Sequence, residues 1–326
     1  MKIKKYFLFA FVCLLSVFTL VGCKDDPVDD PVNPDDPIVD PSNPTIPDEP
    51  NTNNPSTNNQ GTNNPNTDNN NSENEITFTE LIAIDNTECK IKVTGIDPDS
   101  IWGYTINIHL ENKSDNKTYM FSVIHASING IQCDPLFATE VAPGKKSNEK
   151  IILLESQLKE SGIKKYTDIE LTFRVYDSND WLAEDIVQET INIYPYGEDK
   201  AIKYVRESQS TDNIIIDNEY VTAIVTGYED DIIWGYSVKL FIVNKTNKTL
   251  MFSINNASIN GYMADPFFAT SISKEKCLFT SVSWLDSILE DNGIITVEEI
   301  EFTVRVYDAN DWLADDFTNT TIILNP

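Results

Sequence analysis

Acidic and amide side chains gather in two short segments of the chain, and both segments occur twice. The first copy holds Asp97, Asp99, Asp177, Asn179 and Asp180, and the second holds Glu229, Asp230, Asp231, Asp308, Asn310 and Asp311. Ligand sets made only of oxygen suit Ca²⁺ better than softer metals, provided that the two segments of a copy meet in space. Tight turns use the same residue types, and no segment has the spacing of a known calcium motif. The sequence therefore admits Ca²⁺ as a cofactor but favours turns.

A tryptophan follows the second acidic segment in each copy. Trp181 and Trp312 each begin the sequence Trp-Leu-Ala. Such rings could form platforms for a sugar ring or for a partner protein. The apolar residues that follow them favour packing in the core instead.

Residues for acid–base or nucleophilic catalysis are scarce. The chain has two histidines, His109 and His125, and the second copy replaces them with Phe241 and Asn256. No nucleophile-elbow motif accompanies them. We therefore expect a protein that is not an enzyme.

The cysteines do not form a redox or zinc motif, because no Cys-x-x-Cys occurs. Cys89 and Cys133 align with Val221 and Ala264 of the second copy. They either form a disulfide that is special to the first copy or act as small buried hydrophobic residues, and we favour free thiols. Cys277 is expected to be a partly exposed strand residue.

The N-terminus has the pattern of a targeting segment. Three lysines precede an apolar run at 6–21, which ends in Leu20-Val21-Gly22-Cys23. This ending resembles the lipobox of bacterial lipoproteins. The resemblance implies removal of residues 1–22, lipidation of Cys23 and an extracytoplasmic protein that lipid anchors to the cell membrane. An uncleaved signal anchor is the alternative.

The charge of the chain limits its partners. Its 52 acidic against 24 basic side chains give a net charge of -28 at pH 7. A nucleic acid or an anionic lipid surface would repel such a chain. Attachment to a membrane must therefore come from the acyl chains on Cys23.

Residues 23–75 are expected to be a disordered tether. They hold ten of the sixteen prolines and are otherwise dominated by Asp, Asn, Thr and Ser. No periodic apolar face exists in this segment, so it cannot form a core.

The rest of the chain is one module written twice. Ile-Trp-Gly-Tyr at 101–104 returns at 233–236, and Ala-Ser-Ile-Asn-Gly at 126–130 returns at 257–261. Asn-Asp-Trp-Leu-Ala at 179–183 returns at 310–314. The offset of 132 or 131 residues is too long for a solenoid repeat, so each copy is a domain. We name residues 76–196 repeat 1 and residues 213–326 repeat 2.

Apolar and polar residues alternate within each repeat, which predicts half-buried strands. In repeat 1 we expect seven strands, at 76–84, 89–94, 102–110, 118–125, 150–154, 168–176 and 186–194. One short helix is expected per repeat, from the spacing of Leu154 and Leu158 before Gly162 and of Leu285 and Leu289 before Gly293.

Seven short strands predict an all-β protein with two tandem immunoglobulin (Ig)-like β-sandwich domains. The two acidic segments of each repeat would then be the B–C and F–G loops, which lie at the same end of such a sandwich. Trp102 and Trp234, at the start of an alternating strand, are expected in the core, and so is Trp284.

The whole chain resembles bacterial surface lipoproteins in which a lipobox and a spacer precede tandem Ig-like domains of unknown function. The resemblance is one of architecture and implies no catalytic activity. We expect a non-enzymatic, lipid-anchored cell-surface protein for adhesion or ligand binding, with a surface protein or a glycan as partner. A calcium- or carbohydrate-dependent binding module and a structural component of the envelope are the alternatives.

Overall fold

The computed structural model describes residues 75–153, 155–231 and 233–326. The expected targeting segment, Cys23 and nearly all of the expected tether lie outside this range. Within it, no helix combines the length and the apolar character that crossing a membrane requires.

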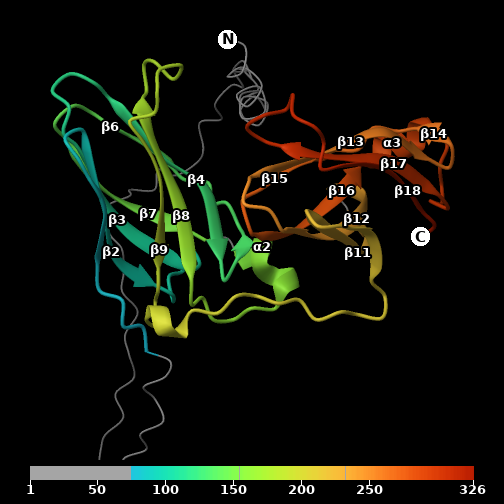
Figure 1. Cartoon of the computed structure of the whole chain (residues 1–326), viewed down its shortest axis with the longest axis horizontal. Coiled ribbons are helices and arrows are strands. Elements are labelled where there is room, and N and C mark those ends of the chain that lie inside the picture. The colour runs from blue at the N-terminus through green and yellow to red at the C-terminus, as the bar shows by residue number, and fades with distance from the viewer. Residues whose placement is uncertain (1–74, 154, 232) are drawn as a thin grey trace, which may run out of the picture. The chain divides into compact units, whose positions relative to one another are not determined.

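Repeat 1 is built almost entirely of strands (Figure 1). Its elements are β1 (Leu81–Asp85), β2 (Cys89–Asp97), β3 (Thr105–Asn112), β4 (Tyr119–Ile128), β5 (Ile131–Gln132), β6 (Ala138–Val141), β7 (Lys146–Ile152), α2 (Glu155–Leu158), η2 (Lys159–Ser161), β8 (Ile169–Asp177) and β9 (Val187–Ile193). The seven strands expected from the sequence are present with shifted ends, and β5 and β6 were not foreseen.

Repeat 2 follows the same order of elements after η3 (Glu198–Lys200). It contains β10 (Asn213–Asp217), β11 (Val221–Asp231), β12 (Gly235–Asn244), β13 (Leu250–Ile259), β14 (Tyr262–Met263), β15 (Ala269–Ile272), β16 (Cys277–Trp284), α3 (Asp286–Asp291), β17 (Ile300–Asp308) and β18 (Thr318–Leu324).

The pairing of the strands is Ig-like. In repeat 1 one sheet has the order β1-β2-β3-β7, and the other contains β5, β4, β8 and β9, with β6 on β4. Strands β2, β3, β4, β6, β7, β8 and β9 thus correspond to A, B, C, C′, E, F and G, and β1 is an additional strand before A. The structure confirms the predicted Ig-like β-sandwich.

Each repeat has its own hydrophobic core between its sheets. The alternation along β8 is confirmed, because Ile169, Leu171, Phe173 and Val175 are all fully buried. Trp284 is also fully buried, as predicted, and its Nε1 donates a hydrogen bond of 2.8 Å to the Ala264 carbonyl.

Trp102 and Trp234 are more than half exposed, so their predicted place in the core is wrong. Each precedes a glycine with positive φ, 103° at Gly103 and 67° at Gly235. This turn breaks the alternation before Tyr104, which is buried. The alternation of apolar and polar residues could not reveal that the strand starts after the tryptophan.

The helices are confirmed in position but are short. Gly293, with a φ of 67°, follows α3; its N–H bonds to the Glu290 carbonyl, and the N–H of Ile294 bonds to the Leu289 carbonyl. This is a Schellman C-terminus. Gly162 ends η2 in the same left-handed conformation.

The repeated Ala-Ser-Ile-Asn-Gly sequence forms a tight hairpin turn in both repeats. Asn129 and Gly130 have φ values of 52° and 87°, and Asn260 and Gly261 have φ values of 50° and 80°. Two consecutive positive φ angles are typical of the type I′ turn, which favours Asn-Gly. The turn connects β4 to β5 and β13 to β14.

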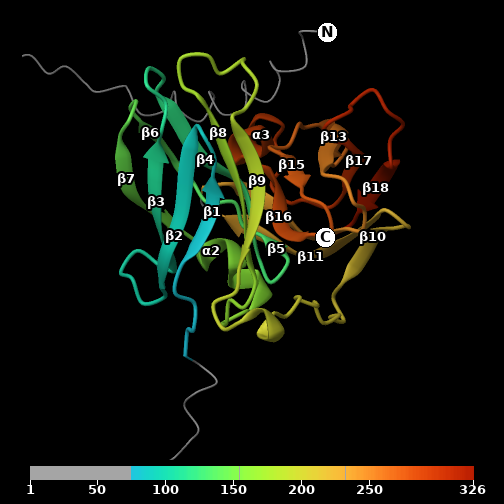
Figure 2. The same ribbon diagram turned by 60° about the vertical axis from the view of Figure 1, so that its left-hand side comes forward.

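The tip of the β4–β5 hairpin contacts repeat 2 (Figure 2). Ile131 of β5 pairs in parallel with Cys277 of β16, whose N–H bonds to the Gly130 carbonyl at 3.0 Å. The Gln132 amide donates to the Ser271 carbonyl and accepts from the Ser273 N–H, at 2.9 and 2.8 Å. Strands of both repeats therefore form one nine-stranded sheet.

The three described cysteines are free and buried. The preference for free thiols at Cys89 and Cys133 is confirmed. Cys277 is only 8% exposed, so its expected partial exposure is wrong, because the repeat contact covers it.

Candidate functional site

The two acidic segments of a repeat lie at opposite ends of its sandwich. Asp97 pairs with Thr105 at the start of β3, whereas Asp177 pairs with Tyr119, which follows the end of β3. The expected meeting of these segments is therefore wrong. The additional strand β1 shifted the strand count by one, so the segment at Asp97 and Asp99 connects A to B.

The first acidic segment stabilises its own turn. In repeat 2 the Asp231 carboxylate accepts the N–H groups of Ile233 and Trp234 at 2.8 and 2.9 Å. These backbone donors lower the pKa of Asp231. Glu229 forms an ion pair with Lys239 at 2.7 Å, and Asp230 lies beside it in β11.

The second acidic segment starts the F–G loop and also forms a turn. Asp177 contacts Lys117 at 3.4 Å, and Asp308 contacts Lys248 at 2.9 Å. Lys248 lowers the pKa of Asp308. Each carboxylate accepts the N–H of the amide residue two positions later, Asn179 or Asn310. Asp180 and Asp311 follow within the same turns.

No group of three or more His, Cys, Asp or Glu side chains in the described ranges has the arrangement of a metal site. The acidic residues contact backbone N–H groups and lysines instead. Their geometry fits the turn interpretation.

The F–G loops carry apolar side chains at the surface. Trp312 is 55% exposed, so packing in the core is wrong for this residue, and Leu313 beside it is also exposed. In repeat 1 Leu182 is exposed and Trp181 is half-buried. Both loops therefore present the leucine to solvent, and the loop of repeat 2 presents the tryptophan as well.

An arginine holds each F–G loop. The Arg174 Nε donates to Asp185 at 2.9 Å, and its guanidinium lies 4.3 Å from the centre of the Tyr176 ring. In repeat 2 Arg305 bonds to Asp316 at 2.8 Å and lies 4.3 Å from the ring centre of Tyr307. This pair of contacts was not predicted from the sequence, although all three residue types recur at the repeat offset.

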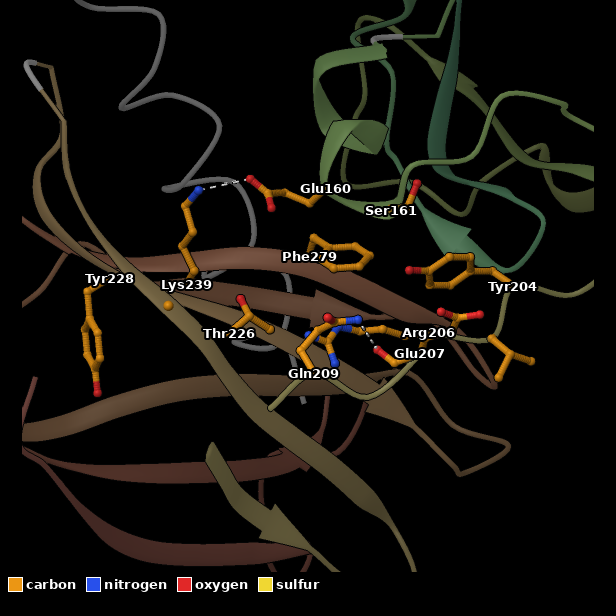
Figure 3. A pocket seen from close by; sticks show the side chains of 12 residues that line it. Glu160, Ser161, Tyr204, Arg206, Glu207, Gln209, Thr226, Tyr228, Lys239 and Phe279 are labelled. Atoms are coloured by element: carbon orange, nitrogen blue, oxygen red, sulfur yellow. Dashed lines mark hydrogen bonds and ion pairs between the residues drawn. The ribbon is translucent and has the colours of Figure 1, made fainter. Parts of the chain in front are cut away.

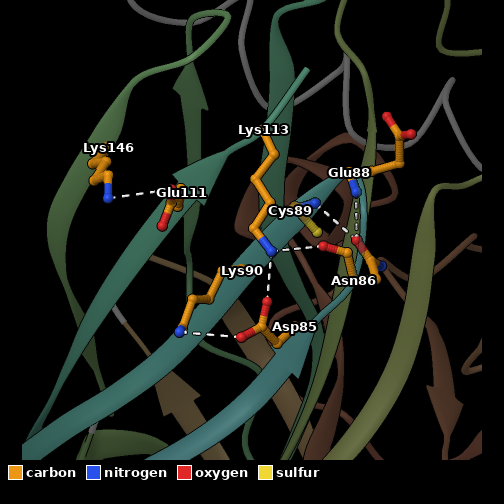
Figure 4. Close-up of polar contacts among 8 residues, drawn as sticks. All are labelled: Asp85, Asn86, Glu88, Cys89, Lys90, Glu111, Lys113 and Lys146. Carbon is orange, nitrogen blue, oxygen red and sulfur yellow. Dashed lines mark hydrogen bonds and ion pairs between the residues drawn. The ribbon is translucent and has the colours of Figure 1, made fainter. Parts of the chain in front are cut away.

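A second lysine–aspartate contact connects the hairpin of β1 and β2 to the B–C loop (Figure 4). The Lys113 ammonium bonds to Asp85 at 2.5 Å and to the Asn86 carbonyl at 2.6 Å. Lys113 and Lys90 lower the pKa of Asp85. Lys245 makes the equivalent contacts in repeat 2. Because both repeats make these contacts, we interpret Lys113 and Lys245 as structural residues.

A groove of about 690 Å³ lies beside the contact between the repeats (Figure 3). It is lined by residues that the sequence did not single out, including Tyr204, Arg206, Tyr228 and Lys239. Lys239 forms an ion pair with Glu160 at 3.0 Å across the groove, and Arg206 forms a two-bond pair with Asp212 just outside its lining. The positive charges at the groove are therefore compensated.

The thiols are poorly suited to nucleophilic chemistry. Burial raises the pKa of Cys89 to about 11 and that of Cys133 and Cys277 to about 12. Such thiols stay protonated at neutral pH. His109 bonds to Asn148 at 2.7 Å, and His125 lies 3.8 Å from Asp134.

No protein-family model and no curated protein matches the chain. Among solved structures it is similar to the YadV chaperone, with 9% identity over 68% of this chain and 92% of that chain and a TM-score of 0.21. The periplasmic chaperone SfaE shows 8% identity over 65% and 88%, with a TM-score of 0.20. A protein of unknown function from Porphyromonas gingivalis W83 shows 10% identity over 68% and 91%, with a TM-score of 0.19.

Likeness at these identities and TM-scores supports no argument about binding or activity. The strand pairing described above defines the class, a tandem Ig-like β-sandwich protein. Its duplicated F–G loops are the candidate functional site.

Proposed function

We propose that this chain is a non-enzymatic cell-surface protein that binds a ligand through its two F–G loops. One observation carries the proposal. The sequence Asn-Asp-Trp-Leu-Ala is identical in both loops, although its leucine is exposed in both and its tryptophan is exposed in repeat 2. Core packing explains why buried residues recur between repeats, but it does not explain recurrence of exposed apolar residues.

The arginine contacts fit this role. They hold each loop to its own sheet, so binding would order few further side chains. An exposed indole beside an exposed leucine suits an apolar protein surface, and an exposed indole also suits the face of a sugar ring.

Lipid on Cys23 is the proposed attachment, with an extracytoplasmic location. The lipobox resemblance supports it. The Cys23→Ala variant would then escape lipidation, keep its targeting segment and have the size of the unprocessed chain. A variant that remains membrane-bound at the size of the processed protein would contradict the proposed anchor.

The ligand class can be tested on the loops directly. Crosslinking on intact cells and a glycan panel would compare the full chain with Trp312→Ala plus Trp181→Ala. Ile295→Ala is the control, because this residue is the most exposed apolar side chain described. We expect the tryptophan variant to lose its crosslinked proteins and the control to keep them.

A carbohydrate ligand is the second candidate, supported by the exposure of Trp312. Loss of a glycan signal in the tryptophan variant, without any change in crosslinked proteins, would select it. If both variants behave like the unmodified chain in both assays, the F–G loops are not the binding site.

A further inference from the structure

The tip of the hairpin after Asn129 is a docking element in repeat 1. Ile131 is 0% and Gln132 is 4% exposed, because Ile131 lies against β16 of repeat 2 and Gln132 bonds to Ser271 and Ser273 of the same repeat. An ion pair of 2.9 Å between Lys276 and Glu170 adds to this contact. The contact joins the sheet of β10, β11, β12 and β16 in repeat 2 to the sheet of β5, β4, β8 and β9 in repeat 1.

The same tip in repeat 2 is uncovered. Tyr262 and Met263, which align with Ile131 and Gln132, are 53% and 67% exposed. The turn that presents them has nearly the same φ values as its counterpart in repeat 1. Repeat 2 therefore carries a formed docking element whose apolar side chains lie in solvent.

The matching edge is present in repeat 1. Strand β7 aligns with β16 and is the last strand of its sheet, so its outer side is open within the described residues. Lys145 aligns with Lys276, and Glu301 aligns with Glu170. Neither side chain forms an ion pair in the described part of the chain. The charges that would form a second copy of the internal ion pair are thus both available.

We propose that the β13–β14 tip of one chain docks on the β7 edge of a second copy of this chain. The contact would repeat the internal one, with Tyr262 beside Lys146 and with Glu301 paired to Lys145. Because the two surfaces are different, the association is heterologous and proceeds head to tail. Chains would form short open arrays, or rings where the rotation closes.

This contact is weaker than the internal one. Inside the chain, Phe241 and Phe279 of repeat 2 also pack against Tyr204 of the segment between the repeats. Repeat 1 has His109 and Asn148 at the aligned positions. The aromatic part of the contact is therefore missing, and association depends on protein concentration.

Charge reversal tests the proposal. Sedimentation velocity would follow the full chain in detergent with increasing protein concentration, at about 0.15 M salt to screen the acidic surface. The anchor is unchanged in all variants, so differences between them report the proposed contact. We expect Lys145→Glu and Glu301→Lys each to weaken association roughly three- to tenfold. The double variant should restore it.

Two further variants define the direction of assembly. Tyr262→Asp weakens the tip, and Lys145→Glu weakens the edge, so each protein alone should associate less than the unmodified chain. A mixture of the two should form more dimers than either protein alone, because one intact tip then meets one intact edge. An unmodified chain that does not associate would refute the proposal. So would single charge variants that associate like the unmodified chain, or a double variant that stays as weak as the singles.

Discussion

The buried amide of Asn129 gives the sharpest stability prediction. Its Oδ1 accepts the N–H and the hydroxyl of Thr167, both at 2.9 Å, and the N–H of Asp168 at 3.1 Å. Its Nδ2 donates to the Lys165 carbonyl at 2.9 Å. Asn129→Ala removes all four bonds. The buried N–H of Thr167 then loses its partner, at a cost of about 1–3 kcal/mol.

Backbone conformation adds to this cost. Asn129 has a φ of 52°, and alanine in the left-handed region is less favourable by roughly 1–2 kcal/mol. Together these effects predict that Asn129→Ala lowers the free energy of unfolding by about 2–5 kcal/mol. Asn129→Gly separates the two causes, because glycine also loses the four bonds but adopts this φ without strain.

Asn260 in repeat 2 is the matched control. It has the same turn and bonds to Glu298, Glu299 and Thr296, but these groups are exposed to water. Asn260→Ala should therefore cost about 2 kcal/mol less than Asn129→Ala. Urea titration followed by tryptophan fluorescence measures both changes, provided that the m-value is constant. Equal losses in the two variants would refute the role of the buried bonds.

Three further predictions concern other parts of the chain. Gly235→Ala should lower the free energy of unfolding by more than about 2 kcal/mol, since its Cβ would lie 2.3 Å from a backbone oxygen at a φ of 67°. Gly95→Ala, with open space around it, is the control, and thermal unfolding measures both variants. The Arg206 guanidinium holds the pKa of Asp212 at about 2, below its ordinary value of 3.8, so the stability that this carboxylate contributes is present above pH 4 and is lost as the pH falls from about 4 to about 2. Asp212→Asn should flatten that part of a plot of unfolding free energy against pH, and an unchanged plot would argue against the pair. Cys133 and the other two described cysteines should react with Ellman's reagent only after denaturation, and rapid reaction of the native chain would show that these thiols are accessible.

Much of the fold follows from local patterns in the sequence. Alternation along β8 places Phe173 and its neighbours in the core, and the glycines after α3 and η2 end short helices as expected. Both effects act between residues that are close in the chain. The comparison of the two repeats then extends each prediction to its second copy.

The errors arose where a local pattern could not determine long-range geometry. The extra strand β1 has the same alternation as any other strand, so the sequence does not mark it as additional. Counting it as strand A assigned Asp97 to the wrong loop and to the wrong end of the sandwich. Trp102 was wrongly placed in the core because the positive φ at Gly103 breaks the alternation of side chains between the two faces of the strand.

The exposed F–G loops were found by their repetition, whereas the contact between the repeats was not. Phe241 and Phe279 stand where repeat 1 has His109 and Asn148. This gain of apolar residues on one outer sheet face is the signal that a comparison of the repeats contains. It becomes interpretable once the partner of that face, Tyr204, is known.

The parallel pairing of Ile131 with Cys277 has a consequence for synthesis of the chain. The ribosome makes the hairpin tip first, and the strand that covers it emerges well over a hundred residues later. During that interval repeat 1 can fold with an isoleucine uncovered at its tip, as Tyr262 is in the finished protein. Nascent molecules held close together would then be at greatest risk of pairing with a neighbour before their own second half arrives.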